Sequence, residues 1–361
     1  MPNTVLETRV RAAYRAQACA AAISVGAMVF SMGAGIAITI CLNAAYISAL
    51  SVLPVTALTA LACRRSLRRQ AERSGQQRAE SGGLSRALCV LLALTLVACA
   101  IFCLAALVNL AEQSLLRQAR MTWIAALSLL AAGLCALSGG TGISRLGFML
   151  RWILPVGLLV LCAQGLTLES HAGLFPLLGR GTSQLGLSAL AMLGGAAPVL
   201  MLMLPPPALR EAGEEAQRCP VPGPGFFMGR VLAGAVVGIV LLVVLALCNS
   251  YESLRTLQNW GERMFILCCN EPREGIFQSL LTLLQITAMM IGAVSMICAA
   301  EQALVRAWPG LGAHRMGLAL CLVLCGAAFY ALIRFGFIIA LSCAPFLLIP
   351  LAVCLLGSGR M

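Results

Sequence analysis

The chain has 361 residues, of which 60% are hydrophobic and 11% are charged, and its mean hydropathy is +0.94. A soluble domain of this length could not bury so much apolar surface, so the composition excludes the soluble classes and predicts an integral membrane protein. The net charge of +12 does not indicate nucleic-acid binding, because the arginines lie mainly in short loops and no basic stretch is interleaved with aromatic residues.

Ten apolar runs follow one another along the chain, and each has the length of about 17–25 residues that a helix needs to cross the hydrocarbon core. We therefore expect an all-α fold of about ten transmembrane helices in one polytopic domain, residues 1–361, embedded in a lipid bilayer. Tight hairpins are expected at Asn43 and Arg334, which alone separate the first two and the last two runs. The expected spans are 18–41, 44–62, 87–110, 121–138, 146–166, 184–204, 229–248, 275–299, 317–333 and 335–356.

The loop arginines predict how these spans are oriented. If the N-terminus lies in the cytoplasm, the inner segments hold 17 arginines and the outer segments hold 7, with Arg151 left inside a span. Cytoplasmic loops of membrane proteins carry the excess of basic residues. We therefore expect a multi-pass protein of the cell membrane with its N- and C-termini in the cytoplasm.

Residue types that carry catalysis or hold metals form no pattern in the sequence. Most of the 17 cysteines lie inside apolar runs, where a thiol packs as a small hydrophobic group, and no CxxC motif occurs. Phosphate-binding loops, HExxH, GxSxG and paired carboxylates are absent from the sequence. The sequence therefore predicts a protein that is not an enzyme and that has no cofactor and no metal site.

Two of the expected spans are interrupted by glycines near their middle. The first span carries Gly33-Ala34-Gly35 shortly after Ser31, and the sixth carries Gly194-Gly195 ahead of Pro198. Such glycines cost about 1 kcal/mol each relative to alanine and let a helix unwind, which exposes backbone N–H groups to an anionic ligand. Matching interruptions in two halves are typical of transporter-type sites. The candidate ligand-binding residues are Ser31, Gly33, Ala34, Gly35, Gly194 and Gly195.

Each of these features also has a simpler explanation. The glycines can serve close helix–helix packing, since small residues let backbones approach one another in membranes. Arg151 lies less than two turns from the cytoplasmic end of the fifth span, where it either snorkels to the surface or faces inward as a functional cation. Glu301 ends the eighth span at the same surface and is either solvated or part of such a charge function.

Several segments together resemble one known family. They are Met32-Gly33-Ala34-Gly35-Ile36 followed by Tyr46-Ile47-Ser48, Gly139 through Arg145, Phe175 through Gly181, Leu204-Pro205-Pro206, and Arg273-Glu274. The family is the B subunit of spore germinant receptors, a branch of the amino acid–polyamine–organocation transporters. The resemblance covers nearly the whole chain, through motifs that are short and degenerate.

The resemblance implies a fold, a ligand and partners. The fold would be two inverted five-helix repeats of LeuT-like architecture, about 18–166 and 184–356, with helices 1 and 6 broken at the glycines. A small nutrient, typically an amino acid, would bind at the break. The protein would assemble with an A subunit and a lipoprotein-like C subunit in the inner membrane of the spore.

The chain departs from the family pattern at three positions. Ala44, Thr141 and Ala196 stand where the resemblance leads us to expect acidic residues. This favours a nutrient sensor over an ion-coupled transporter, because a sensor needs differential binding but no coupled ion. A secondary transporter for amino acids or amines is the first alternative, and a membrane scaffold that binds no ligand is the second.

Overall fold

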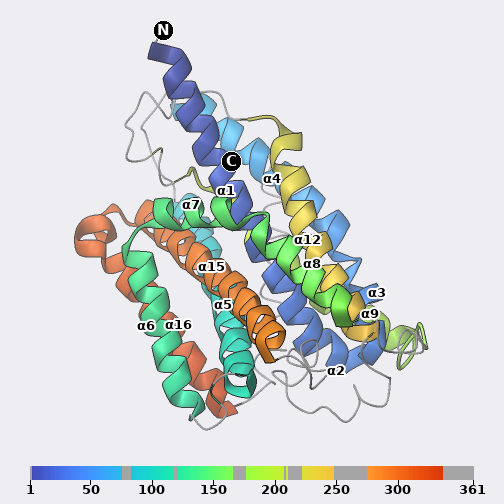
Figure 1. Cartoon of the computed structure of the whole chain (residues 1–361). Helices are drawn as coiled ribbons and strands as arrows, with labels where there is room; N and C mark the ends of the chain where they lie inside the picture. Colours follow the sequence, from blue (N-terminus) through green and yellow to red (C-terminus); the bar gives the residue numbers. More distant parts are fainter. Residues whose placement is uncertain are drawn as a thin grey trace.

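The computed structural model describes residues 2–74, 83–114, 116, 120–165, 176–206, 209, 222–247 and 275–335. Almost all of these residues are helical and none of them forms a strand, which confirms the predicted all-α class. Figure 1 shows a bundle of long helices in which α1 runs through the middle, away from the end marked N.

Five of the described helices are long and apolar enough to cross a membrane, and a bent pair raises the number to six. They coincide with the first, third, sixth, seventh and eighth expected spans. Helices of this kind indicate a membrane-embedded protein, whereas the full set of ten spans is not confirmed. Arg334, where the sequence predicts a hairpin, is still helical, and of the tenth run, 335–356, only Phe335 is among the described residues. The five helices are Glu7–Ala49, Arg86–Gln113, Thr182–Met203, Gly225–Leu247 and Thr282–Ala307.

The chain reverses direction after its first span. Leu42 has a positive φ of 54°, with ψ −127°, beside Asn43, where the sequence predicts a hairpin. The helix that follows runs back toward the end of the molecule that holds the N-terminus (Figure 1). The elements of this hairpin are α1 (Pro2–Met32), η1 (Gly33–Ala37), α2 (Ile38–Cys41), η2 (Leu42–Ala44), α3 (Ala45–Ala49) and α4 (Val52–Ser74).

The fifth expected span, 146–166, is wrong as a single helix. It is divided between α7 (Gly140–Leu150) and α8 (Ile153–Gly165), with a turn at Arg151 and Trp152. Pro155 explains the break, because it cannot donate to the carbonyl of Arg151 and its ring clashes with that group. The fourth span and α7 form the bent pair, at 104°. The preceding helices are α5 (Gly83–Ser114) and α6 (Met121–Leu137).

The second half of the described chain supplies six elements. The sixth span begins as α9 and continues without a break as a 3₁₀-helix, η4. The elements are α9 (Thr182–Met192), η4 (Leu193–Met203), α12 (Pro224–Leu247), α15 (Gly275–Ala307), η5 (Pro309–Arg315) and α16 (Met316–Phe335).

Elements from the two halves pack against each other in antiparallel pairs. The first pair is α1–α2 with α9–η4: Gln17 Nε2 donates to the Met201 carbonyl at 3.1 Å, and Cys41 Sγ donates to Ser188 Oγ at 3.3 Å. Early residues of the first span therefore meet late residues of the sixth. Helices α4 and α12 are also in contact, and Arg64 in the second half of α4 donates to the Pro222 carbonyl just before α12, so this pair is antiparallel as well.

Two more pairs of helices, one from each half, also pack antiparallel. Helices α5 and α15 pack with Cys103 beside Gly292, while Cys89 at the start of α5 lies within the electrostatic influence of Arg306 at the end of α15. Helices α6 and α16 pack through Gly133 and Gly326, each of which lies against a leucine of the other helix.

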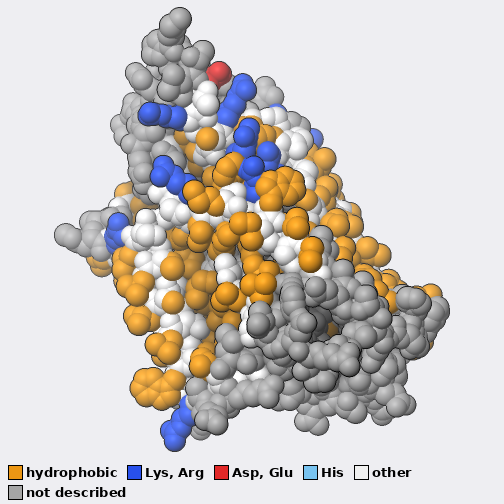
Figure 2. Space-filling view, in the orientation of Figure 1, with side chains coloured by type: hydrophobic (Ala, Val, Ile, Leu, Met, Phe, Trp, Pro, Cys, Tyr) orange, Lys and Arg blue, Asp and Glu red, His pale blue; other side chains and the backbone are white. Residues whose placement is uncertain are grey.

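The outer surface is that expected of a protein in lipid. Large apolar side chains of α6 and α8 point outward; Trp123 is 67% exposed and Leu130 is 60% exposed. Figure 2 shows apolar side chains over much of the visible face, whereas most of the arginine groups gather toward the end that holds the N-terminus. The charged end and the apolar face suit a headgroup region and hydrocarbon respectively.

Candidate functional site

The glycine segment of the first span is not unwound. Gly33–Ala37 forms a single π-helical stretch, η1, whose five residues are all buried. A π-helix keeps its backbone hydrogen bonds by making them one residue longer, and such stretches are frequent at functional sites. The predicted break is therefore corrected to a widening of the helix, which leaves the segment backbone-bonded within the membrane.

The glycines of both spans lie at close helix contacts. A Cβ atom on Gly33 would overlap the side chain of Leu242 in α12. One on Gly195 would lie 3.0 Å from the Val29 side chain in α1 and 3.6 Å from that of Val52 in α4. These contacts are what the packing explanation of the glycines requires.

The sixth span is likewise continuous, in a tighter helix. Residues Leu193–Met203 form the 3₁₀-helix η4, which contains Gly194, Gly195 and Pro198, all buried. Runs of 3₁₀ longer than three or four residues are uncommon, and a stretch inside a longer helix often marks a hinge or strain. The two glycine segments thus share a departure from α geometry, toward a wider helix in one span and a narrower helix in the other.

The remaining predicted binding residues are also enclosed. Ser31 is fully buried, and its hydroxyl has no hydrogen-bond partner in the described part of the chain. Ala34 is fully buried, and the Gly35 carbonyl accepts from Thr39 Oγ1 at 2.6 Å. None of the predicted binding residues lines either of the two described cavities. Ligand binding by them stays a prediction.

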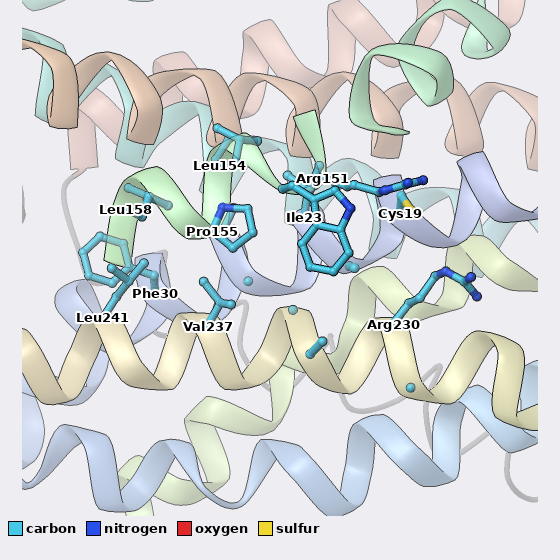
Figure 3. A pocket seen from close by; sticks show the side chains of 18 of the residues that line it. Cys19, Ile23, Phe30, Arg151, Leu154, Pro155, Leu158, Arg230, Val237 and Leu241 are labelled. Carbon is cyan, nitrogen blue, oxygen red and sulfur yellow. The ribbon is translucent and has the colours of Figure 1, made fainter. Parts of the chain in front are cut away.

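The larger described cavity lies beside α1, between α8, α12 and α15, and has a volume of about 640 Å³. Figure 3 shows it from close by: Arg151 and Arg230 lie at one end near Cys19, and Phe30, Leu158 and Leu241 lie at the other. This volume falls within the range of about 300–1,000 Å³ that small-molecule sites occupy. We call it the α1–α8–α12 cavity.

Three arginines converge at one end of this cavity. Arg15 comes from α1, Arg151 from the turn before α8, and Arg230 from the first part of α12. Arg151 stacks on the Phe148 ring with its guanidinium carbon 3.9 Å from the centroid. Arg230 stacks in the same way on Phe226 at 4.1 Å. Aromatic rings hold both cations in place without neutralising their charge.

The polar groups around these arginines do not supply an anion. Arg230 forms a side-chain hydrogen bond with Cys19 and donates to the Phe226 carbonyl at 2.5 Å. No aspartate or glutamate is among the described residues that line the cavity. Arg15 is exposed and Arg151 and Arg230 are partly buried, so solvent screens part of their mutual repulsion, and a bound anion would relieve the rest. The arginine end is therefore suited to a carboxylate or a similar anionic group.

The opposite end of the cavity contains one polar group among apolar walls. Gln285 of α15 is 2% exposed, and neither atom of its amide has a hydrogen-bond partner in the described part of the chain. Its neighbour Leu284 contacts Gly157 of α8, one residue before Leu158, which places Gln285 at the end away from Arg151. A buried amide without partners costs free energy unless a ligand or water satisfies it.

The sequence singles out part of this site. It predicts Arg151 to be a functional cation or a snorkelling residue, and the structure places Arg151 at one end of the cavity (Figure 3). Glu301, the other predicted charge, lies beside Gly317 of α16 and does not line the cavity. Arg15 and Arg230 carry only the general signal of loop arginines, since convergence of three helix ends is not visible in a sequence.

Known proteins give no further guide to the site. No family profile matches the chain, and none of the curated proteins matches it. The resemblance to the germinant receptor B subunit therefore remains an inference from the short motifs.

Proposed function

We propose that this chain is a membrane-embedded receptor subunit that binds a small organic anion in the α1–α8–α12 cavity. The observation that carries the proposal is the convergence of Arg15, Arg151 and Arg230 at one end of an otherwise apolar cavity of about 640 Å³. In this proposal the chain is the nutrient-sensing B subunit of a spore germinant receptor, with A and C subunits as partners in the inner spore membrane.

The antiparallel helix pairs support the two inverted repeats of this proposal. Each of the first four spans of the first half packs against the span of the same rank in the second half. The four pairs are α1 with η4, α4 with α12, α5 with α15 and α6 with α16. An inverted repeat about an axis in the membrane plane makes equivalent helices run in opposite directions. Each of the four pairs does so.

The charges of the cavity favour a sensor over the two alternatives. An ion-coupled transporter needs a group that binds the coupled cation, and the described residues of the cavity lining offer three cations and no carboxylate. A scaffold without a ligand would account for these arginines as basic residues of the inner surface, but it would leave the cavity beside them without a role. Ligand binding that shifts a conformational equilibrium satisfies both observations.

The proposal is tested by ligand-induced stabilisation of the purified protein. We would measure the thermal unfolding midpoint with a panel of carboxylates, amino acids, amines and nucleosides. A ligand at about 100 times its dissociation constant adds about 2.7 kcal/mol to the free energy of unfolding. We expect carboxylates to raise the midpoint in the wild type and in Arg120→Gln, whose arginine is exposed outside the cavity.

The arginine variants decide where the ligand binds. In Arg151→Gln and Arg230→Gln the shift should be lost, because each removes a charged hydrogen-bond donor from the cavity. If the ligand still raises the unfolding midpoint of both variants, the ligand binds elsewhere, and the glycine segments become the candidate site again. If a carboxylate binds, uptake of the same compound into vesicles would identify a transporter, and binding without uptake a sensor.

A further inference from the structure

We propose that the ligand of this cavity is a chain-like carboxylate that ends in a second hydrogen-bonding group, with the carboxylate at the arginines and the far end at Gln285. The inference rests on the proposed function, since it names the chemical class that the same cavity takes. Its three parts are the charged end, the apolar length between the ends and the buried amide.

The charged end argues against an amino acid. A zwitterion would bring its ammonium group within a few bonds of its carboxylate, and hence beside Arg15, Arg151 and Arg230. The described residues of the cavity lining include no acidic side chain to receive an ammonium group. Repulsion by three guanidinium groups would offset much of what the carboxylate gains. A carboxylate without a neighbouring amine avoids this repulsion.

The length of the cavity sets the length of the ligand. Along α1 the lining runs from Cys19, at the arginine end, to Phe30 at the other. Eleven helical steps of about 1.5 Å correspond to about 16 Å. With C–C bonds of about 1.5 Å, an extended chain advances about 1.25 Å per methylene, so a chain of about 12 carbons spans this distance.

The far end calls for a polar terminus rather than a methyl group. Both the donor and the acceptor of the Gln285 amide lack partners in the described part of the chain. Both amide atoms are shielded from the cavity in the structure, so the amide has to rotate toward the cavity to meet a ligand. A hydroxyl group there satisfies both atoms, since it donates to the amide oxygen and accepts from the amide nitrogen. A methyl group placed there would leave both atoms of a 2% exposed side chain unsatisfied. The geometry therefore selects an ω-hydroxy carboxylate over a plain fatty acid.

The ligand reaches the cavity from the lipid side. Trp152 and Ile153, at the start of α8, are 67% and 57% exposed, and Trp152 lines the cavity. Apolar residues exposed at a cavity rim in a membrane protein face the hydrocarbon, where an amphiphilic carboxylate is already dissolved. Such a ligand needs no aqueous path to its site.

The experiment uses the full chain in lipid nanodiscs with Trp152 as its sole tryptophan, after replacement of Trp123, Trp260 and Trp308 by phenylalanine. The fluorescence of Trp152 is titrated with dodecanoate, 12-hydroxydodecanoate, methyl dodecanoate and leucine. We expect 12-hydroxydodecanoate to bind about tenfold more tightly than dodecanoate. The uncharged ester and leucine should bind at least tenfold more weakly than dodecanoate.

Variants separate the inference from the function on which it rests. In Gln285→Leu the two acids should bind equally, whereas the control Gln184→Leu on α9, outside the cavity, should keep the preference. Equal binding of the two acids by the wild type, lost in Arg151→Gln, would overturn the inference and leave the proposed function standing. Tighter binding of leucine than of 12-hydroxydodecanoate would also overturn it. Failure of every carboxylate to bind would overturn both.

Discussion

At the scale of single residues, glycines allow the backbones of α1 and α12 to touch. A Cβ on Gly234 would overlap the carbonyl oxygen of Ala22, and one on Gly26 would lie 2.8 Å from the carbonyl oxygen of Gly234. Backbone atoms cannot move aside as a flexible side chain can. The crossing of these two helices, which forms a wall of the cavity, therefore depends on the absence of a side chain at position 234.

We expect Gly234→Ala to lower the free energy of unfolding by about 1–3 kcal/mol, since overpacking of a close contact costs about this much. The matched control is Gly229→Ala on the same helix, where a Cβ meets nothing within 4 Å. Alanine is the better helix former, so the control should be neutral or stabilising by up to about 1 kcal/mol. Thermal unfolding in detergent measures both, and equal midpoints for the two variants would contradict the close contact.

Gln17 ties the first span to the end of the sixth. Its Nε2 donates to the carbonyls of Met201 and Leu204, at 3.1 and 3.0 Å, and the side chain is 4% exposed. We expect Gln17→Leu to destabilise the protein by about 2 kcal/mol, because two buried carbonyls lose their donor. Arg11→Ala, at an exposed position of the same helix, should change stability by less than about 0.5 kcal/mol. Unfolding midpoints that agree between the two variants would show that Gln17 contributes nothing here.

Among the residues that line the cavity, the sequence singles out a charged one but not the uncharged ones. Arg151 stands out because a cation inside an apolar run is expensive, and it does line the cavity. Gln285 and Cys19 give no such signal, since one polar or sulfur-bearing side chain in a span is ordinary. The glycines of α12 carry a readable pattern, Gly234-x-x-x-Gly238, which indicates close packing in a membrane helix. Which helix they approach can only come from the tertiary fold.

At the scale of elements, the sequence locates the irregular helices but not their form. It predicts unwound breaks at Gly33–Gly35 and Gly194–Gly195, whereas the structure has a π-helix and a 3₁₀-helix there. Both forms keep the backbone hydrogen-bonded, which hydrocarbon demands, while changing the pitch. Pro198 removes one donor from the ladder, and this is the only part of the 3₁₀ geometry that the sequence states directly.

The contact between the end of α2 and the middle of α9 can be tested by a cross-link. Cys41 Sγ lies 3.3 Å from Ser188 Oγ, and Ser188 Oγ donates to Ser48 Oγ at 2.9 Å. We expect Ser188→Cys to form a disulfide with Cys41 under mild oxidation, detected by mass spectrometry of the digested protein. Ser183→Cys, at an exposed position of the same helix, should not pair with Cys41. Absence of the cross-linked peptide from the oxidised Ser188→Cys variant would contradict the antiparallel register of the two spans.

At the scale of the whole molecule, composition predicts the class and periodicity predicts most of the spans. The single helix at 146–166 is wrong because the break at Arg151 and Pro155 lies within an apolar run, and hydropathy does not register a turn. Pairing between the halves has no sequence signal beyond the two glycine segments. The four antiparallel pairs depend on which apolar faces fit together. In lipid this fit is decided by the shapes of the side chains, which hydropathy does not describe.

The orientation of the molecule in the membrane follows from where its arginines gather. Arg64, which donates to the Pro222 carbonyl, and Arg315, which donates to the Leu137 carbonyl, belong to the predicted inner segments. Arg120 and Arg180 belong to the outer ones, and 17 against 7 over the chain predicts a cytoplasmic N-terminus. We expect a green fluorescent protein fused after Ser74 to fluoresce and an alkaline phosphatase fused after Ser114 to be active. The opposite pattern, with phosphatase activity after Ser74, would show that the orientation of the molecule in the membrane is the reverse of the predicted one. The arginine end of the cavity would then face the outer surface, where the positive-inside rule gives no reason for three arginines to meet.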